Sequence, residues 1–385
     1  MQSYTVTQVA NGRTFERSPV LENPHRKERT WPSHDAAAVE AFHKTLPDYN
    51  QTQLHELKSV AAELGLGQVF LKDESTRFGL PAFKVLGASW AVHRAVSQRV
   101  HVEPEDVSVA ELATLVKNKS LELQLVTCTA GNWGRAVARI AKDLSIPARV
   151  YVPSYTSEQT KALVSNEGAD VRVDLGKSFD DALAATQKDA EETGALLVQD
   201  VTWEGYEEAP SWAVEGYGTM MQEVDRQVAE ATGGKRPTLV VGSVGGGLWA
   251  QAVVTHYRNI DAPTMIVLVE ADSCAGFKES LHCGENTFVQ SGDTTIMEGL
   301  NNGSTIDTAW PLLRDGTDVA VVATDREAHQ DVQYLEKQGV NAGPCGAATL
   351  VALRKLCQAD IRFNKADTIA VLLNTEGNRL YRVPE

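Results

Sequence analysis

Residues 238–248, TLVVGSVGGGL, give the strongest indication of the fold, because an apolar run leads directly into three consecutive glycines. The run predicts a buried strand, and residues 248–257 predict a helix after the turn. Such glycines let backbone amides converge on an anion beside the positive end of the helix dipole. GxGxxG is absent because Val244 stands where a glycine is required, and no P-loop lysine follows. The stretch predicts a monophosphate cup or a tight turn without a ligand, and it disfavours a Rossmann oxidoreductase.

Short apolar runs alternate with helical patterns along most of the chain. The predicted strands cover residues 69–72, 123–128, 148–152, 170–173, 196–199, 238–241, 265–270, 319–323 and 368–373. Other predicted helices cover residues 53–64, ended by Gly65, residues 82–95, opened by Pro81, and residues 134–144, 157–166 and 179–192. Several strands are continuously apolar, as expected of parallel strands covered on both faces. The pattern indicates a doubly wound α/β fold, preceded by an irregular arm over residues 1–35.

The composition excludes several classes of protein. The chain has 385 residues, is 43% hydrophobic and carries a formal net charge of −15, which argues against a nucleic-acid or anionic-membrane partner. No apolar run approaches the ~20 residues of a membrane span, and the N-terminus lacks the apolar core of a signal peptide. Five cysteines without a CxxC pair predict neither a zinc site nor a disulfide framework. We expect a cytoplasmic protein without a bound metal.

A lysine with unusual surroundings lies in FLKDESTRFGLPAFKVLGA, residues 70–88. Lys84 falls in the first turn of the helix that Pro81 is predicted to open, between Phe83 and Val85. Apolar neighbours and the positive end of the helix dipole both disfavour an ammonium group, which suits a Schiff-base nucleophile. The alternative is an ordinary surface lysine on an amphipathic helix.

A second polar loop, TCTAGNWG at residues 127–134, again follows a predicted strand. Thr129 and Asn132 lie among glycines, so the loop amides could bind a carboxylate and Asn132 could hydrogen-bond a cofactor oxygen. An Asx turn that caps the next helix is the alternative.

The order of lysine, Asn-Gly loop and glycine-rich cup resembles pyridoxal-phosphate (PLP) enzymes of fold type II, the group of the tryptophan synthase β-subunit. Four longer stretches resemble the diaminopropionate ammonia-lyases within it: LKDESTRFGLPAFKVLG (71–87), QDVTWEGYEEAPSWAVEGYGTM (199–220), SGDTTIMEGL (291–300) and LLNTEGN (372–378). The resemblance runs from about residue 70 to residue 378. It implies two open, twisted, mostly parallel sheets, one in a large domain (residues 1–84 and 205–385) and one in an inserted domain (residues 85–204), with the cofactor in the cleft.

The resemblance also implies roles for individual residues. Lys84 would hold the cofactor covalently, and Asp200 would be a general base, although the residue alone suggests a helix cap or an ion-pair partner. Asn132 would bind the ring hydroxyl, and Asn374 or Thr375 would face the pyridine nitrogen through a neutral hydrogen bond. The phosphate would lie on Gly242, Ser243, Val244, Gly245, Gly246 and Gly247, and the substrate carboxylate on Thr129, Ala130 and Gly131.

The implied reaction is an α,β-elimination on a small amino acid such as 2,3-diaminopropionate, giving ammonia and a 2-keto acid through aminoacrylate, in a homodimer. Two departures from the family pattern bear on it. Ala130 stands where the lyases carry a second acid/base aspartate, with Trp133 in place of a histidine, and Pro344 stands where relatives often carry glutamate. Because alanine cannot transfer a proton, we expect strong preference for one enantiomer. A β-replacement synthase and a non-catalytic PLP-binding protein remain alternatives.

Overall fold

The computed structural model describes residues 2–129, 131–173, 176, 178–260, 262–290 and 295–384. The chain divides into two compact units. The larger unit holds residues 1–34, 51–77 and 220–385, and the smaller unit holds residues 35–50 and 78–219. Helix α8 (Glu208–Thr232) begins in the smaller unit and ends in the larger one.

The larger unit is built on a seven-stranded sheet with the order β3-β12-β11-β10-β13-β5-β4. Its inner strands pair in parallel and the two edge strands pair antiparallel. The strands are β3 (Val20–Glu22), β4 (Leu54–Glu56), β5 (Gln68–Asp73), β10 (Leu239–Ser243), β11 (Met265–Ala271), β12 (Val319–Ala323) and β13 (Ile369–Asn374). Every residue of β10, β12 and β13 is buried, which is why these strands read as continuous apolar runs.

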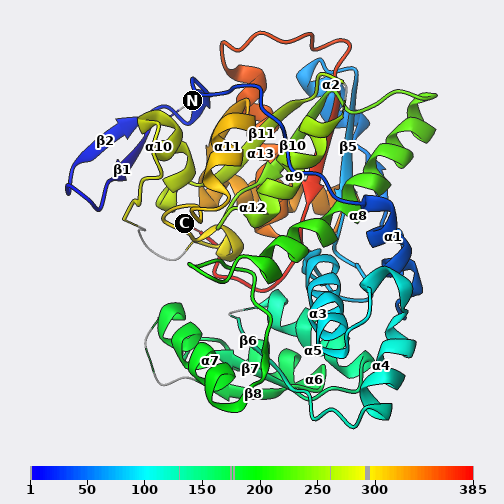
Figure 1. The fold of residues 1–385 in the computed structure, drawn as a ribbon. Coiled ribbons are helices and arrows are strands. Elements are labelled where there is room, and N and C mark those ends of the chain that lie inside the picture. Colours follow the sequence, from blue (N-terminus) through cyan, green and yellow to red (C-terminus); the bar gives the residue numbers. More distant parts are fainter. Residues whose placement is uncertain are drawn as a thin grey trace. The chain divides into compact units, whose positions relative to one another are not determined.

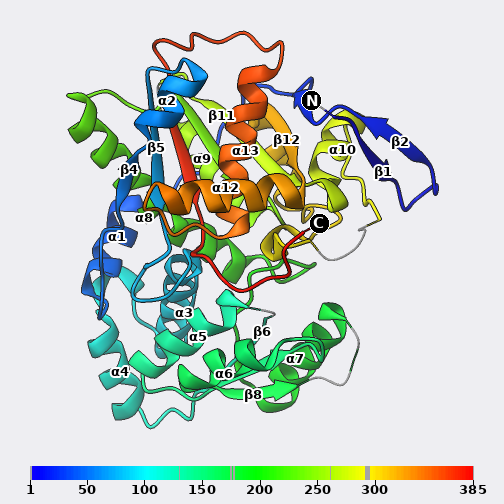
Figure 2. The same ribbon diagram turned by 180° about the vertical axis from the view of Figure 1, so that it is seen from behind.

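Helices cover both faces of this sheet. Figure 1 shows α9 (Leu248–Asn259) and α11 (Trp310–Gly316) in front of the strands, and Figure 2 shows α12 (Asp325–Lys337) and α13 (Pro344–Gln358) in front of the opposite face. The remaining helices of the unit are α2 (Lys58–Leu64) and α10 (Gly276–Cys283). Thr324 begins α12 with a capping box that includes Glu327. The arrangement confirms the predicted α/β class with a mostly parallel sheet.

The N-terminal residues are more ordered than the sequence predicts, and the expectation of an irregular arm over residues 1–35 is wrong. Strands β1 (Tyr4–Thr7) and β2 (Thr14–Arg17) form an antiparallel hairpin, seen beside α10 in Figure 1. Strand β3 pairs with β12 at the edge of the large sheet. Strand β3 acquires its hydrogen-bond partner from a distant segment, and the short hairpin strands pair only with each other, so the local composition did not reveal them.

The smaller unit contains a four-stranded parallel sheet with the order β8-β7-β6-β9. Its strands are β6 (Leu125–Cys128), β7 (Ala148–Val152), β8 (Asp170–Val173) and β9 (Leu196–Leu197). Its helices are α1 (Ala36–Thr45), α3 (Lys84–Val100), α4 (Val109–Asn118), α5 (Asn132–Asp143), α6 (Glu158–Asn166) and α7 (Phe179–Thr193). Serine side chains at Ser108, Ser157 and Ser178 cap α4, α6 and α7.

Two predicted helices differ from the structure in their first residues. Residues 53–64 divide into β4 and α2, because Leu54 to Glu56 pair antiparallel with β5 and this pairing overrides the local helical pattern. The predicted stop at Gly65 is confirmed, since Gly65 adopts the left-handed conformation at φ 69°. Helix α3 begins at Lys84 rather than at Pro81, after turns in which Phe78 and Gly79 both have positive φ.

Candidate active site

The glycine turn between β10 and α9 is shaped by close contacts. A Cβ atom on Gly245 would lie 2.4 Å from the carbonyl oxygen of Gly299, and Gly247 has φ +109°. Both positions therefore require glycine. The amides of Gly245, Gly246 and Gly247 donate to no described residue, and they precede the first turn of α9. Unsatisfied amides at a helix N-terminus are what a phosphate group requires.

The first half of the same stretch belongs to the sheet. Gly242 and Ser243 are residues of β10 and pair in register with Leu268 and Val269. The Val244 amide donates to the Val269 carbonyl at 2.8 Å, so it is not available to an anion. Six residues, 242–247, are expected to hold a phosphate. Among them, Gly245, Gly246 and Gly247 have backbone amides that donate to no described residue.

A buried amide lies in the same unit at the end of β13. Asn374 is fully buried, and its Nδ2 donates to Asp73 Oδ1 at 3.0 Å. Its Oδ1 has no hydrogen-bond partner among the described residues. A Cβ on Gly346 would lie 1.7 Å from that oxygen, so the start of α13 needs glycine there. An unpaired buried oxygen is unusual and fits a ligand contact. Thr375, the other candidate for this contact, is also buried.

Lys84 and Asp200 meet in the smaller unit. Lys84 is the first residue of α3, and its Nζ donates to Asp200 Oδ2 at 2.5 Å. The Lys84 side chain is 34% exposed and that of Asp200 is 14% exposed. The lysine amine is thus held by a carboxylate and reached by solvent, whereas the sequence predicted apolar surroundings. A charge-assisted bond of this length allows a proton to pass between the two groups.

Two residues that the sequence analysis did not single out hold Asp200 in place. The fully buried Gln199 donates from Nε2 to Asp200 Oδ1 at 3.4 Å and accepts, at Oε1, from the Cys128 amide at 2.9 Å. The backbone amide of Gln199 donates to the Tyr206 hydroxyl at 2.9 Å, and burial raises the pKa of that hydroxyl. Gln199 thereby ties Asp200 to the end of β6. The adjacency of Gln199 to Asp200 in the sequence was the only available signal.

The loop after β6 satisfies its own polar groups. The Gly131 amide donates to Thr129 Oγ1 at 2.9 Å, so this amide has a partner before any substrate carboxylate arrives. Asn132 begins α5 and is partly exposed. Trp133 is buried, and its Nε1 donates to Thr127 Oγ1 at 3.1 Å, which makes it a packing residue. Ala130 lies outside the described residues.

An acid does occur beside Pro344, the first residue of α13, but another segment supplies it. Glu376 accepts at Oε1 from the Cys345 amide at 3.1 Å, and a Cβ on Gly343 would lie 2.9 Å from the same oxygen. The Cys345 thiol is buried, and burial raises its pKa. Pro344 stands where relatives often carry glutamate, but Glu376 supplies a carboxylate beside that position.

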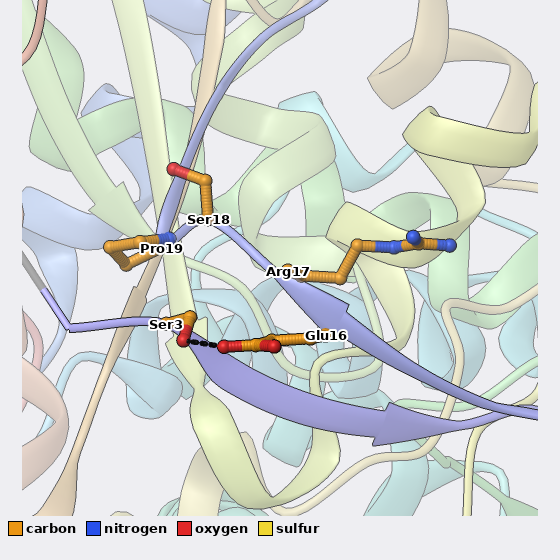
Figure 3. A pocket seen from close by; sticks show the side chains of 5 residues that line it. All are labelled: Ser3, Glu16, Arg17, Ser18 and Pro19. Atoms are coloured by element: carbon orange, nitrogen blue, oxygen red, sulfur yellow. Dashed lines mark hydrogen bonds between the residues drawn. The ribbon is translucent and has the colours of Figure 1, made fainter.

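Other features of the described residues, a surface hollow among them, do not indicate a different active site. An open hollow of about 450 Å³ lies against the hairpin, lined by Ser3, Glu16, Arg17, Ser18 and Pro19 (Figure 3). Arg17 points away from Ser3 in Figure 3, and its guanidinium pairs with Glu279 at 2.8 Å. Among the residues that the structure describes, no cluster of acidic, histidine and cysteine side chains could hold a metal ion.

The chain matches known proteins over most of its length. The family model described as "Pyridoxal-phosphate dependent enzyme" matches residues 45–375. The chain belongs to this family. It is 36% identical to the diaminopropionate ammonia-lyase of Salmonella typhimurium strain LT2 over 293 residues, which cover 74% of this chain and 72% of that protein.

Solved structures agree with the family and with fold type II. Diaminopropionate ammonia-lyase from Escherichia coli in complex with D-serine superposes with a TM-score of 0.83 at 26% identity, covering 98% of this chain and 95% of the other. The same enzyme in complex with an aminoacrylate-PLP azomethine reaction intermediate gives 0.82 at 28% identity, with 93% of each chain covered. The cofactor of the family is pyridoxal phosphate, and the free glycine amides and the unpaired Asn374 oxygen fit its phosphate and ring.

Proposed function

We propose that this protein is a PLP-dependent ammonia-lyase that catalyses α,β-elimination on a small amino acid such as 2,3-diaminopropionate, releasing ammonia and a 2-keto acid. The observation that carries the proposal is the contact between Lys84 Nζ and Asp200 Oδ2 at 2.5 Å. It pairs the lysine expected to hold the cofactor with the carboxylate expected to move the proton. The 36% identity to a named ammonia-lyase supports the same reaction.

Each group has a defined task in this proposal. When bound, pyridoxal phosphate supplies an electron sink that stabilises negative charge at the substrate Cα. The amides of Gly245, Gly246 and Gly247 would hold its phosphate, and Lys84 would be its covalent anchor. Lys84 Nζ or Asp200 Oδ2 then removes the Cα proton, since the two atoms share a hydrogen bond and either can relay the proton to the other.

Substrate binding is proposed for the loop after β6. Thr129 is buried next to the start of α5, and its hydroxyl already accepts the Gly131 amide. Its own O–H is therefore the group of that pair that can donate to a substrate carboxylate. Asn132, partly exposed at the first turn of α5, is proposed to bind the ring hydroxyl of the cofactor.

The decisive experiment is a substrate panel of D- and L-amino acids with β-amino, β-hydroxy or β-thio groups. Keto acid and ammonia are measured with and without an added thiol or amine. We expect both products from diaminopropionate without any added nucleophile, and strong preference for one enantiomer because Ala130 cannot transfer a proton. Product formed only with an added nucleophile would establish β-replacement instead. Equal rates on both enantiomers would contradict the stereochemical argument.

The cellular setting and assembly extend the proposal. No described helix combines the length and the apolar composition that a membrane crossing requires. All five cysteines are free, which fits a reducing compartment and so a cytoplasmic location. The homodimer rests on the resemblance to fold type II enzymes. Light scattering on the purified protein should give twice the mass of the chain, and the mass of one chain would refute the dimer.

A further inference from the structure

A strained turn precedes the helix that begins with Lys84. Phe78 has φ +51°, in the left-handed region that a bulky side chain rarely adopts, and Gly79 follows it with φ +70°. The four other described residues that have positive φ and are not glycine are polar and exposed, whereas the Phe78 side chain is buried. A backbone held in this conformation costs free energy, so it persists only where the surrounding structure enforces it.

Hydrogen bonds hold the Phe78 backbone at both ends. Its amide donates to Asn50 Oδ1 at 2.7 Å, and its carbonyl oxygen accepts from Arg139 Nη1 at 3.1 Å. Its ring packs against the rings of His43 and Tyr49, at centroid distances of 6.0 Å and 5.7 Å. All of these residues belong to the smaller unit. The turn is thus fixed from several sides, and the bond from Arg139 is the charge-assisted one among these contacts.

Arg139 also belongs to the helix that carries a second candidate site residue. Helix α5, which packs on α3, begins at Asn132, and Arg139 lies about two turns further on, or about 10 Å along the helix axis. Its Nε donates to Glu167 Oε2 at 2.7 Å, while its Nη1 reaches the Phe78 carbonyl. The planar guanidinium therefore spans two acceptors and is held in one orientation. Through this side chain, α5 fixes the turn from which α3 starts.

We propose that Arg139 is a positioning residue for Lys84. By holding the left-handed turn at Phe78, it fixes the lysine amine relative to Asn132, and so relative to the cofactor that both residues would contact. The inference rests on the proposed function, because it assigns the cofactor to Lys84. Only five residues separate Phe78 from Lys84, and the last of them, Phe83, is buried, so a displaced turn moves the lysine. A displacement of about 1 Å can lower a rate about 100-fold.

The test compares Arg139→Met with Arg135→Met in the full-length protein reconstituted with pyridoxal phosphate. Arg135 is the matched control, because it lies on the same helix and pairs with Glu167 at 3.1 Å, and no described bond joins it to Phe78. In Arg139→Met we expect kcat on diaminopropionate to fall roughly 10- to 100-fold with little change in KM. The visible circular dichroism per bound cofactor should also weaken, because this signal reports how firmly the cofactor is oriented. Arg135→Met should keep both values.

A residue that only stabilises the fold would lower the urea midpoint and leave kcat and the circular dichroism of the folded protein unchanged. Wild-type values of both in Arg139→Met therefore overturn the inference, and so does an equal loss in Arg135→Met, which would trace the effect to Glu167. If Arg139→Met does not fold, Arg139→Lys, which keeps a positive charge beside Glu167 but lacks the planar fork, is measured in the same way. A wild-type protein that binds no pyridoxal phosphate, or binds it at another lysine, refutes the proposed function instead.

Discussion

Two strand-to-helix turns in this protein have similar sequences and different uses. The turn after β10 contains Gly245, Gly246 and Gly247, and none of their amides donates to a described residue. The turn after β6 contains Gly131, whose amide already donates to Thr129 Oγ1. Gly131 also has open space around a built Cβ and an extended φ of −175°. The three glycine amides of the first turn are free to bind a ligand. In the second turn the Gly131 amide is already engaged within the protein.

The difference shows that glycine content alone does not identify an anion site. Both turns follow a parallel strand and open a helix, so both have the favourable dipole. The turn after β10 combines that dipole with three consecutive glycine amides that donate to no described residue and with a backbone contact that forbids a larger residue at Gly245. The turn after β6 is instead tied, through Gln199, to Asp200. We propose that it positions catalytic and substrate-binding groups.

Removing Lys84 should have the largest effect. We expect Lys84→Ala to lower turnover of diaminopropionate by at least about 10²–10⁴-fold, the scale on which a positioned proton-transfer group acts. The glycine turn is untouched, so the variant should still bind pyridoxal phosphate, although non-covalently. Turnover and cofactor content after dialysis are measured together. Lys188→Ala, on the exposed face of α7, is the control. Wild-type turnover by Lys84→Ala would refute the assigned mechanism.

The comparison between the turns can be tested with one substitution in each. In Gly245→Ala the new methyl group must displace the Gly299 carbonyl, at an overpacking cost of about 1–3 kcal/mol. We expect cofactor affinity to fall roughly 10- to 100-fold, as measured by fluorescence titration. Gly131→Ala, which meets no described atom, should change affinity less than about threefold. A larger loss in Gly131→Ala would reverse the assignment of the two turns.

A smaller effect is expected at Gln199, which links the turn after β6 to Asp200. Gln199→Leu leaves the Cys128 amide and Asp200 Oδ1 without this partner, which should cost about 1–3 kcal/mol in urea unfolding. The rate constant kcat should fall more than KM changes, because the proton-transfer group is misaligned. Gln98→Leu, at an exposed bond to Glu208, is the control for the substitution itself. Full kcat in the destabilised Gln199→Leu protein would show that Gln199 is structural only.

The effect with the least bearing on catalysis is the pH dependence of stability in the sheet that carries the glycine turn. Glu270 on β11 is fully enclosed and accepts from the amides of Phe277 and Lys278. Burial raises its pKa from 4.5 to about 8. The folded state therefore keeps a proton that the unfolded chain releases, and stability falls as pH rises from about 4.5 to about 8, by up to about 1.4 kcal/mol per unit.

Glu270→Gln should remove this slope, since an amide oxygen still accepts one of the two bonds and does not titrate. Urea unfolding of both proteins at several pH values between 5 and about 8 measures the difference. The buried Lys278 contributes little in this range, because burial lowers its pKa to about 8 and its effect lies above that value. Parallel curves for the two proteins would contradict the assignment.

The sequence predicted the parallel core of the fold well, because strands buried on both faces must be continuously apolar. Strands β7, β8 and β12 have the bounds that the apolar runs indicated. It failed where a strand depends on a distant partner. Leu54 to Glu56 form an edge strand only through pairing with β5, and the N-terminal hairpin packs on residues such as Ala275 and Val289.

The candidate site was predictable in its residue types but not in its hydrogen bonds. Lys84 and Asp200 lie 116 residues apart, and the local sequence of Asp200 suggested a cap or an ion pair. An ion pair is what the structure contains, with Lys84 as its partner. Asp73 gave no signal of its own, since only the pairing of β5 with β13 places it beside Asn374. The sequence likewise did not predict that the backbone amides of Val244 and Gly131 donate hydrogen bonds within the protein.

The most direct test of the account is to locate the cofactor chemically. The yellow protein expected after reconstitution is reduced with borohydride, digested, and its peptides are mapped by mass spectrometry. We expect a reduced pyridoxyl group on Lys84, whose Nζ lies 2.5 Å from Asp200 Oδ2, and on no other lysine. A colourless protein without bound cofactor, or a modification at the fully buried Lys72 or any other lysine in place of Lys84, would contradict it.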